Sequence, residues 1–293
     1  QNYFATIVNQ FSAIITLVPV IAKGVESVTS IGEILLSEDV EDNEGKKEIA
    51  DVQGNFSFKD VYFQYKGGGR ATLNGLNLEV KRGETIALVG ESGAGKTTIL
   101  NMVIGFYLTH DGEVLIDGQN LKEIDLRSYR KHLAVVPQTS ILFSGTIREN
   151  ILYGCEGVSE EKLQEVIQAA NLKDLMDSLP EGLDTQVGEN GSHLSGGERQ
   201  RIGLARCYLK EADIYVMDEM TSALDARLEE EIVKKLFAMQ DKTVICITHK
   251  LAAAREAERI LVFDQGKVVE DGSHEDLLAQ GGVYSRLSRG DHQ

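Results

Sequence analysis

The sequence contains no tryptophan, three prolines and three cysteines among its 293 residues. The cysteines, Cys155, Cys207 and Cys246, are odd in number and widely spaced, which argues against both a disulfide framework and a zinc site. We expect reduced, buried thiols in a cytosolic compartment. No long internal repeat or low-complexity segment is visible. Because the chain begins without Met and without a basic leader, we expect no signal peptide and a fragment of a longer protein.

An excess of basic residues is also lacking. The 46 acidic residues outnumber the 30 lysines and arginines, and the net charge is −16. Proteins that bind nucleic acid present a basic patch or stripe to the phosphate backbone, and the sequence shows none. Nucleic acid is therefore not an expected partner. The length allows one large domain or two small ones with a substantial core.

One stretch carries the most specific pattern in the chain. Residues 85–89 (TIALV) are an apolar run that is typical of a buried parallel strand. Residues 90–97 then match G-x-x-x-x-G-K-[ST], and an amphipathic helix ending near Gly105 follows. The candidate binding residues are Gly90, Glu91, Ser92, Gly93, Ala94, Gly95, Lys96, Thr97 and Thr98.

The residue types of this stretch suit a nucleotide phosphate. Glycines let backbone N–H groups turn toward phosphate oxygens, and the helix N-terminus adds a partial positive charge. Lys96 can neutralise phosphate charge, and the Thr97 hydroxyl can ligate Mg²⁺. The alternative is a Gly-rich loop that matches by chance, although few such loops have a strand before them and a helix after them.

The rest of the chain predicts an α/β fold with a mostly parallel sheet, because strand and helix patterns alternate. The first strands, 55–65 and 73–80, flank a hairpin tip at 67–69 and indicate an antiparallel β subdomain. Residues 139–206 instead show helical periodicity and predict an α-helical insertion. Later strands are expected at 112–116, 133–136, 214–217, 243–248, 260–263 and 267–272, and helices at 159–170, 172–179 and 274–287, the last interrupted by Gly281 and Gly282.

The N-terminal region is the most hydrophobic part of the chain. Residues 3–22 carry no charge and are close to the length of a membrane span, and the apolar pattern continues to Leu35 with charges interleaved. We predict that residues 1–37 are the end of a transmembrane helix and its cytosolic extension; a soluble amphipathic helix is the alternative. Residues 38–53 are rich in acidic side chains and predict a solvated linker, so that the domain proper spans 54–293.

Two adjacent carboxylates, Asp218 and Glu219, end the apolar strand at 214–217. In a protein with a phosphate-binding loop, the first acid can hold Mg²⁺ opposite Thr97, and the second can orient or deprotonate an attacking water. Without the phosphate-binding loop, two adjacent carboxylates at a strand end are as often ordinary surface residues as functional ones.

A second helix start lies at Leu194, Ser195, Gly196, Gly197 and Glu198. Ser195 and Glu198 fit the S-x-x-E capping box, so a simple helix cap is one interpretation. The two glycines lower helix propensity but expose backbone N–H groups, which indicates a second anion-binding helix terminus.

In their order along the chain these motifs resemble the ATP-binding-cassette (ABC) superfamily, and LSGGERQR at 194–201 resembles its signature sequence. The resemblance covers nearly all of 55–287. Met220 and Thr139 depart from the usual pattern without removing a catalytic group. By this resemblance Tyr65 stacks on adenine, residues 90–98 bind ATP, Gln138 is the Q-loop glutamine, Asp218 and Glu219 form the Walker B pair, Ser222, Ala223, Leu224 and Asp225 form the D-loop, and His249 is the switch histidine.

The resemblance implies a P-loop NTPase (RecA-like) core and an ATPase. Lys96, Gln138, Glu219 and His249 are then the catalytic residues, and Thr97, Gln138 and Asp218 hold Mg²⁺. A head-to-tail dimer is implied, in which the Ser195 loop of one chain closes over ATP on the other. Intact motifs favour a homodimer over a heterodimer with a degenerate partner.

Segments at 141–151, 185–189 and 272–278 are similar to those of ABC exporters. They imply ATP-driven export across a membrane, a transmembrane-domain partner and a cytoplasmic ATPase domain at a bacterial inner membrane. Two alternatives stay open at this point. One is a soluble ABC-type ATPase that acts as a mechanical module, and the other is a regulatory cassette that binds ATP without useful turnover.

Overall fold

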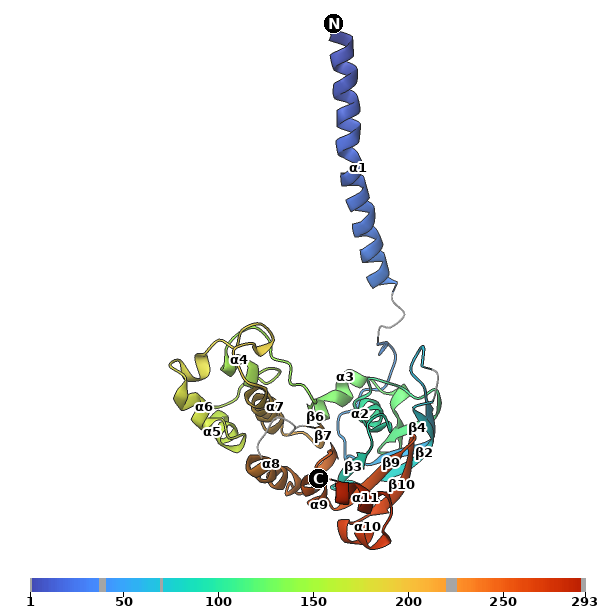
Figure 1. Ribbon diagram of the computed structural model, residues 1–293, viewed down its shortest axis with the longest axis vertical. Coiled ribbons are helices and arrows are strands. Elements are labelled where there is room, and N and C mark those ends of the chain that lie inside the picture. Colours follow the sequence, from blue (N-terminus) through green and yellow to red (C-terminus); the bar gives the residue numbers. More distant parts are fainter. Residues whose placement is uncertain (1, 37–40, 69–70, 220–225, 291–293) are drawn as a thin grey trace. The chain divides into compact units, whose positions relative to one another are not determined.

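A computed structural model describes residues 2–36, 41–68, 71–219 and 226–290. The chain divides into two compact units, residues 1–44 and 45–293 (Figure 1). The second unit therefore begins within the predicted linker 38–53. Ile49 and Val52 are buried in its core, and the Ile49 N–H donates to the Ser128 hydroxyl. The predicted domain limits remain predictions.

The first unit is dominated by one continuous helix, α1 (Asn2–Leu35). Its described side chains are exposed in this chain, and its apolar window has a mean hydropathy of 1.8. Pro19 lies inside the helix without ending it. By length and composition α1 is able to cross a membrane, since about 20 apolar residues suffice.

The second unit contains a six-stranded sheet and a four-stranded sheet. The smaller sheet is antiparallel, as predicted, with the order β2-β1-β4-β5. In the larger sheet five neighbouring strands are parallel, and β10 pairs antiparallel at one edge. The strands are β1 (Phe56–Phe63), β2 (Leu73–Val80), β3 (Thr85–Gly90), β4 (Asp111–Ile116), β5 (Gln119–Asn120), β6 (Leu133–Val136), β7 (Ile214–Asp218), β8 (Thr243–Ile247), β9 (Arg259–Asp264) and β10 (Lys267–Gly272).

The order of the larger sheet, β10-β9-β3-β8-β7-β6, decides which loops meet. The carboxyl ends of parallel strands share one edge, and that edge carries the residues after β3, β6, β7 and β8.

The helices of this unit are α2 (Lys96–Ile104), α3 (Leu126–Tyr129), α4 (Ile147–Ile151), α5 (Glu160–Ala169), α6 (Lys173–Ser178), α7 (Gly196–Lys210), α8 (Ala226–Phe237), α9 (Leu251–Arg255), α10 (His274–Gln280) and α11 (Val283–Gly290), with 3-10 turns at 121–123, 130–132, 182–184 and 189–191.

Both faces of the larger sheet are covered, because successive side chains of each strand point to opposite sides. In β3, Ile86 and Leu88 join a core with α2 and the four-stranded sheet. Ala87 and Val89 face the other way and join a core with α9, α10 and α11. Further along the second face, Tyr215 and other residues of β6, β7 and β8 pack with α4, α5, α7 and α8. Helices α4 to α7 gather beside β6 and β7 (Figure 1). This confirms the predicted α/β core with a helical insertion.

Candidate functional site

The phosphate-binding pattern forms the connection between β3 and α2. Gly90, Gly93 and Gly95 have φ values of 142°, 81° and 103°. At Gly90 a Cβ atom would lie 2.2 Å from the Phe263 carbonyl oxygen, so the loop requires glycine for space as well as for its backbone angle. Gly105 ends α2 in a left-handed conformation, as the sequence predicts.

Lys96 lies at the first position of α2, and its side chain folds back over the loop. Its Nζ donates to the carbonyl oxygens of Gly90 (2.7 Å) and Glu91 (2.8 Å). Burial lowers the pKa of Lys96 from its ordinary value, while the nearby carboxylates of Glu219 and Asp218 oppose that shift. The amine is thus held over the loop by two backbone oxygens, where it can exchange these contacts for phosphate oxygens.

The two adjacent carboxylates lie at the carboxyl edge of the larger sheet. Asp218 is the last residue of β7, and its carboxylate lies near the Thr97 hydroxyl. Burial, and secondly the charge of Glu219, raises the pKa of Asp218 above its ordinary value. Glu219 has a φ of 46°, which is uncommon for a residue with a side chain, and its N–H donates to the Ile247 carbonyl (3.1 Å). That bond fixes the carboxyl end of β7 against β8.

Glu219 joins the ends of three strands. Its Oε2 accepts a hydrogen bond from Gln138 Nε2 at 2.7 Å, and its Oε1 lies 2.7 Å from His249 Nε2. Gln138 follows β6 and His249 follows β8, so both neighbours of β7 contribute a side chain. A carboxylate held at both oxygens is fixed in orientation, which is what a group that positions an attacking water requires.

Tyr65 follows β1 and lines a cavity that the phosphate-binding loop also lines. Its hydroxyl lies 2.9 Å from the Thr98 hydroxyl, and its ring contacts Phe63 and Tyr107 edge-on, with centroids 5.0 and 5.3 Å apart. The cavity has a volume of about 370 Å³ and is lined by Tyr65, the phosphate-binding loop, Glu219 and His249. The structure therefore brings the predicted aromatic, loop and carboxylate residues together.

The signature residues do not line that cavity in the same chain. Ser195 caps α7: its Oγ accepts from Glu198 N at 3.3 Å, and the Glu198 Oε2 accepts from Ser195 N at 2.7 Å. Leu194 is buried, whereas Ser195 is exposed and Gly196, Gly197 and Glu198 are half-buried. The capping box predicted from the sequence is thus present, and its hydroxyl faces solvent. Met220 and the predicted D-loop, Ser222, Ala223, Leu224 and Asp225, lie outside the described residues.

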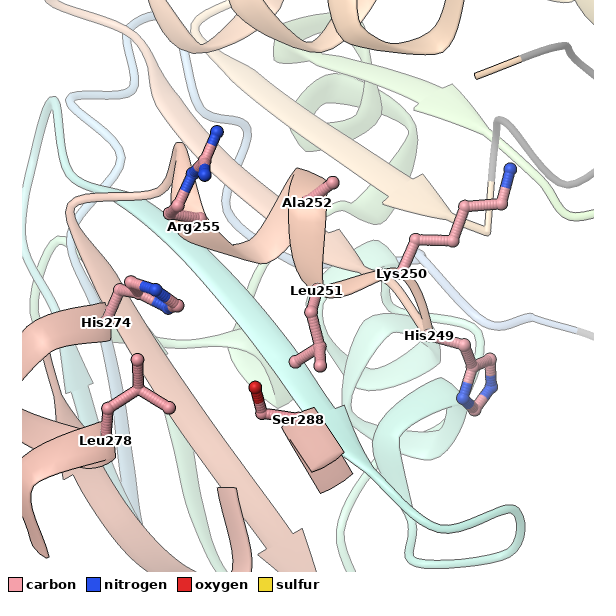
Figure 2. A pocket seen from close by; sticks show the side chains of 8 residues that line it. All are labelled: His249, Lys250, Leu251, Ala252, Arg255, His274, Leu278 and Ser288. Carbon is pink, nitrogen blue, oxygen red and sulfur yellow. The ribbon is translucent and has the colours of Figure 1, made fainter. Parts of the chain in front are cut away.

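A larger cavity of about 580 Å³ lies beside His249, between α9, α10 and α11 (Figure 2). Its basic side chains already have partners. Lys250 pairs with Glu229, Arg255 with Glu256 and His274 with the Tyr284 hydroxyl. The smaller cavity is the better candidate for the nucleotide site despite its size, because the loop glycines and the paired carboxylates lie there.

The sequence comparisons identify the family of this chain. A family model described as ABC transporter matches residues 73–222. The chain belongs to the ABC transporter family. In this family it is 40% identical over 282 residues to the uncharacterized ABC transporter ATP-binding protein YwjA of Bacillus subtilis, and 42% identical over 269 residues to the ATP-dependent lipid A-core flippase of Pseudomonas aeruginosa.

A solved structure shows the same ABC fold. The structure of a bacterial Atm1-family ABC exporter with ATP bound matches 93% of this chain at a TM-score of 0.86 and 37% identity. The alignments cover 96% and 91% of this chain for the two curated relatives, but only 48% and 44% of the relatives themselves. The chain thus spans about half the length of the relatives that it matches.

The chemistry of the ABC site suits a magnesium ion. Thr97 and Asp218 present a hydroxyl and a carboxylate near each other, and Gln138 adds an amide beside the neighbouring Glu219. Among the described residues no three His, Cys, Asp or Glu side chains form a metal cluster. Mg²⁺ is commonly held by one or two protein oxygens together with substrate phosphates and water, and this donor set fits that arrangement.

Sequence reasoning missed several residues around the site. Thr72 lines the cavity, Tyr107 supports the Tyr65 ring, and Phe263 limits the space at Gly90. No local pattern marks them, because their positions depend on how distant strands pair. A second capping box, Thr146 with Glu149 at α4, carries the T-x-x-E pattern and was detectable from the sequence.

Proposed function

We propose that this chain is the ATP-binding and ATP-hydrolysing cassette of an exporter, which dimerises head-to-tail around ATP and drives substrate export across a membrane. The observation that carries the proposal is Glu219, held between Gln138 and His249 at the edge of the sheet that also carries Lys96 and Thr97. Membership of the ABC transporter family and the likeness to an ATP-bound exporter support it.

In this proposal the phosphate-binding loop holds ATP through its backbone N–H groups and the Lys96 amine. Lys96 gives up its contacts with the Gly90 and Glu91 carbonyls in exchange for phosphate oxygens. Tyr65 stacks on the adenine ring. Thr97, Asp218 and Gln138 would hold Mg²⁺, which would supply positive charge to neutralise the phosphates.

In this proposal the Glu219 carboxylate acts in the hydrolysis of ATP. Water attacks the γ-phosphorus in line with the bond to ADP, that bond breaks, and Glu219 orients the water and accepts its proton. His249, 2.7 Å from Glu219, stays beside the reacting phosphate as a donor that can contact developing charge. Gln138 links the carboxylate to the start of the helical insertion.

The exposed Ser195 loop supports the dimer. Since residues 194–198 do not line the cavity of their own chain, we propose that they close over ATP on a second copy. The helix N-terminus then adds backbone donors to the γ-phosphate. We propose a homodimer because Lys96, Ser195 and Glu219 all occur in this one chain.

Helix α1 supports the membrane part of the proposal. It is long and apolar enough to span a bilayer, and the chain covers about half of relatives named as transporters and flippases. We propose that residues 1–37 end a transmembrane domain, with the ATPase domain in the cytoplasm of a bacterium at its inner membrane.

Glu219→Gln tests the catalytic assignment. The amide keeps the size of the side chain but cannot accept the proton, so we expect turnover to fall by about 100- to 10,000-fold with ATP binding retained. Phosphate release and equilibrium ATP binding measure the two effects. Glu211→Gln, at the exposed end of α7, is the matched control and should leave both unchanged. Near-normal turnover of the Glu219 variant would refute the assignment.

A further inference from the structure

One face of α7 is packed against the segment 138–150, which follows β6 and includes most of α4. Three positions on α7 make the contact. Gln200 Nε2 lies 3.4 Å from the Gln138 carbonyl oxygen, Gly203 lies against Ser140, and Arg206 reaches further along the segment. The helix that starts at the signature Ser195 therefore also touches the segment that starts at the candidate catalytic Gln138.

Arg206 makes the strongest of these contacts. Its Nε donates to the Asn150 carbonyl at 2.6 Å, its Nη1 to the Ile141 carbonyl at 2.6 Å, and its Nη2 to the Asn150 Oδ1 at 2.7 Å. In the part of the chain that the structure describes, Arg206 forms no ion pair with a carboxylate. Burial lowers its pKa, but a guanidinium stays charged in proteins. All three bonds are thus charge-assisted bonds to neutral oxygens, which are shorter and stronger than neutral ones.

Asn150 connects Arg206 to the rest of the segment through further hydrogen bonds. It is 2% exposed, and its Oδ1 also accepts from Phe143 N at 2.8 Å. Its Nδ2 donates to the carbonyl oxygens of Phe143 and Thr146, both at 2.9 Å. One amide side chain therefore closes residues 143–150 into a loop, and Arg206 bonds that amide to α7.

Gly203 shows how closely the two parts fit. A Cβ atom at this position would lie 2.4 Å from the Ser140 Oγ and 3.2 Å from the Ser140 Cβ. The helix therefore carries a glycine in its interior, against its own propensity, at the point where the segment crosses it. Gly203 is helical, so space alone requires the glycine here.

We propose that Arg206 is a positioning residue that makes the segment 138–150 move together with α7. Gln138 and Ser195, at the N-terminal ends of these two parts, then move together, Gln138 at the nucleotide of its own chain and Ser195 at the nucleotide of the second chain. The idea rests on the proposed function, because it assigns Gln138 to one chain's site and Ser195 to that of the other. Arg206 itself lies about 16 Å along α7 from Ser195, at 1.5 Å per residue, and touches no nucleotide.

The test uses a fluorescent reporter on the 293-residue chain. The chain contains no tryptophan, so Phe143→Trp places a single indole under Arg206, whose guanidinium carbon lies 5.8 Å from the Phe143 ring centre. In this background we compare Arg206→Met, Arg206→Lys and the control Lys210→Met. Lys210 lies on the same helix and contacts the Arg130 carbonyl instead of the segment. ATP binding, phosphate release and indole emission are measured for each.

We expect Arg206→Met to lower kcat by about tenfold while ATP affinity changes by less than about twofold, and to remove the ATP-dependent change in emission. Arg206→Lys should recover part of kcat and of the emission change, because it keeps the charge and a donor. Lys210→Met should match the parent. An unchanged kcat and emission response in Arg206→Met overturns the proposal while the proposed function stands, and an inactive unsubstituted chain overturns both.

A second pair of variants decides the question if Arg206→Met does not fold. Gly203→Ala forces the segment away from α7, and Ser140→Ala removes the oxygen that collides. We expect Gly203→Ala alone to lower kcat and the double variant to restore most of it, with ATP affinity constant. Equal kcat in the single and the double variant would contradict the proposal.

Discussion

The phosphate-binding loop and the helical region of residues 138–210 are held in place by different forces. The loop follows β3, which pairs with β8 and β9 along its length, so backbone hydrogen bonds on both sides fix it. The helical region consists of four helices of 5, 10, 6 and 15 residues joined by loops. Side chains such as Arg206 and Asn150 bind its backbone segments together. The difference indicates a part that sheet hydrogen bonds fix on both sides and a part that is held by hydrophobic packing and by side-chain bonds to loop backbone.

Shortening a buried leucine to alanine should lower the free energy of unfolding by different amounts in the larger sheet and in the helical region. Leu88 in β3 and Leu163 in α5 are both almost fully buried, with exposed fractions of 0% and 1%. We expect Leu88→Ala to lower the free energy of unfolding by about 4 kcal/mol and Leu163→Ala by about 2 kcal/mol, because the loops around α5 can relax into the cavity. Urea unfolding measures both values. Equal losses would mean that the helical region is as tightly fixed as the sheet.

Removing the loop amine should weaken nucleotide binding more than changing the signature loop. We expect Lys96→Ala to lower ATP affinity by about 100-fold, since two to three kcal/mol is typical of a charge-assisted contact. Ser195→Ala should change the affinity of the single chain by less than about threefold and act on turnover instead. Calorimetric titration with ATP at low protein concentration measures this. Similar losses from the two variants would place Ser195 in the same chain's site.

Two substitutions of Tyr65 test whether its ring contributes to ATP binding beside the phosphate-binding loop. We predict that Tyr65→Ala lowers ATP affinity by about tenfold and that Tyr65→Phe lowers it less, because stacking needs only the ring. The phenylalanine variant does lose the 2.9 Å contact between Tyr65 Oη and Thr98 Oγ1. Titration with ATP and with triphosphate lacking a base separates the ring from the phosphates. Equal losses in the two variants would argue against stacking.

Labelling of the native cysteines measures local unfolding of each part without any substitution in the chain. Burial raises the pKa of both Cys207 and Cys246 to about 12, so at about pH 8 these thiols stay protonated and unreactive toward iodoacetamide. Cys155 is only half-buried and should be the one residue labelled in the native chain. As urea rises, we expect Cys207 in α7 to be labelled before Cys246 in β8. Mass spectrometry of the labelled chain gives the order, and the reverse order would contradict the comparison.

Much of the fold was predictable because its signals are local. The apolar run at 85–89, the loop glycines and Gly105 predict strand, loop and helix in that order, and the structure has them. The box of Ser195 and Glu198 is likewise a matter of four consecutive residues. Helix α8 was not predicted, and the pairing of β1 with β4 has no local signal, whereas the hairpin tip predicted the pairing of β1 with β2. Strand pairing depends on contacts between residues far apart in the chain, which no short pattern contains.

The sequence by itself determined the residue types of the site and the order of its motifs. Glycine, lysine and threonine at fixed spacing specify a phosphate-binding loop because backbone angles and side-chain chemistry act over a few residues. Only the tertiary structure decided that Gln138, Glu219 and His249 meet, since that depends on β6, β7 and β8 being neighbours. It also decided that Arg206 binds Ile141 and Asn150, 65 and 56 residues away. Local chemistry selects the groups, and the register of the sheet and the packing of α7 set the distances between them.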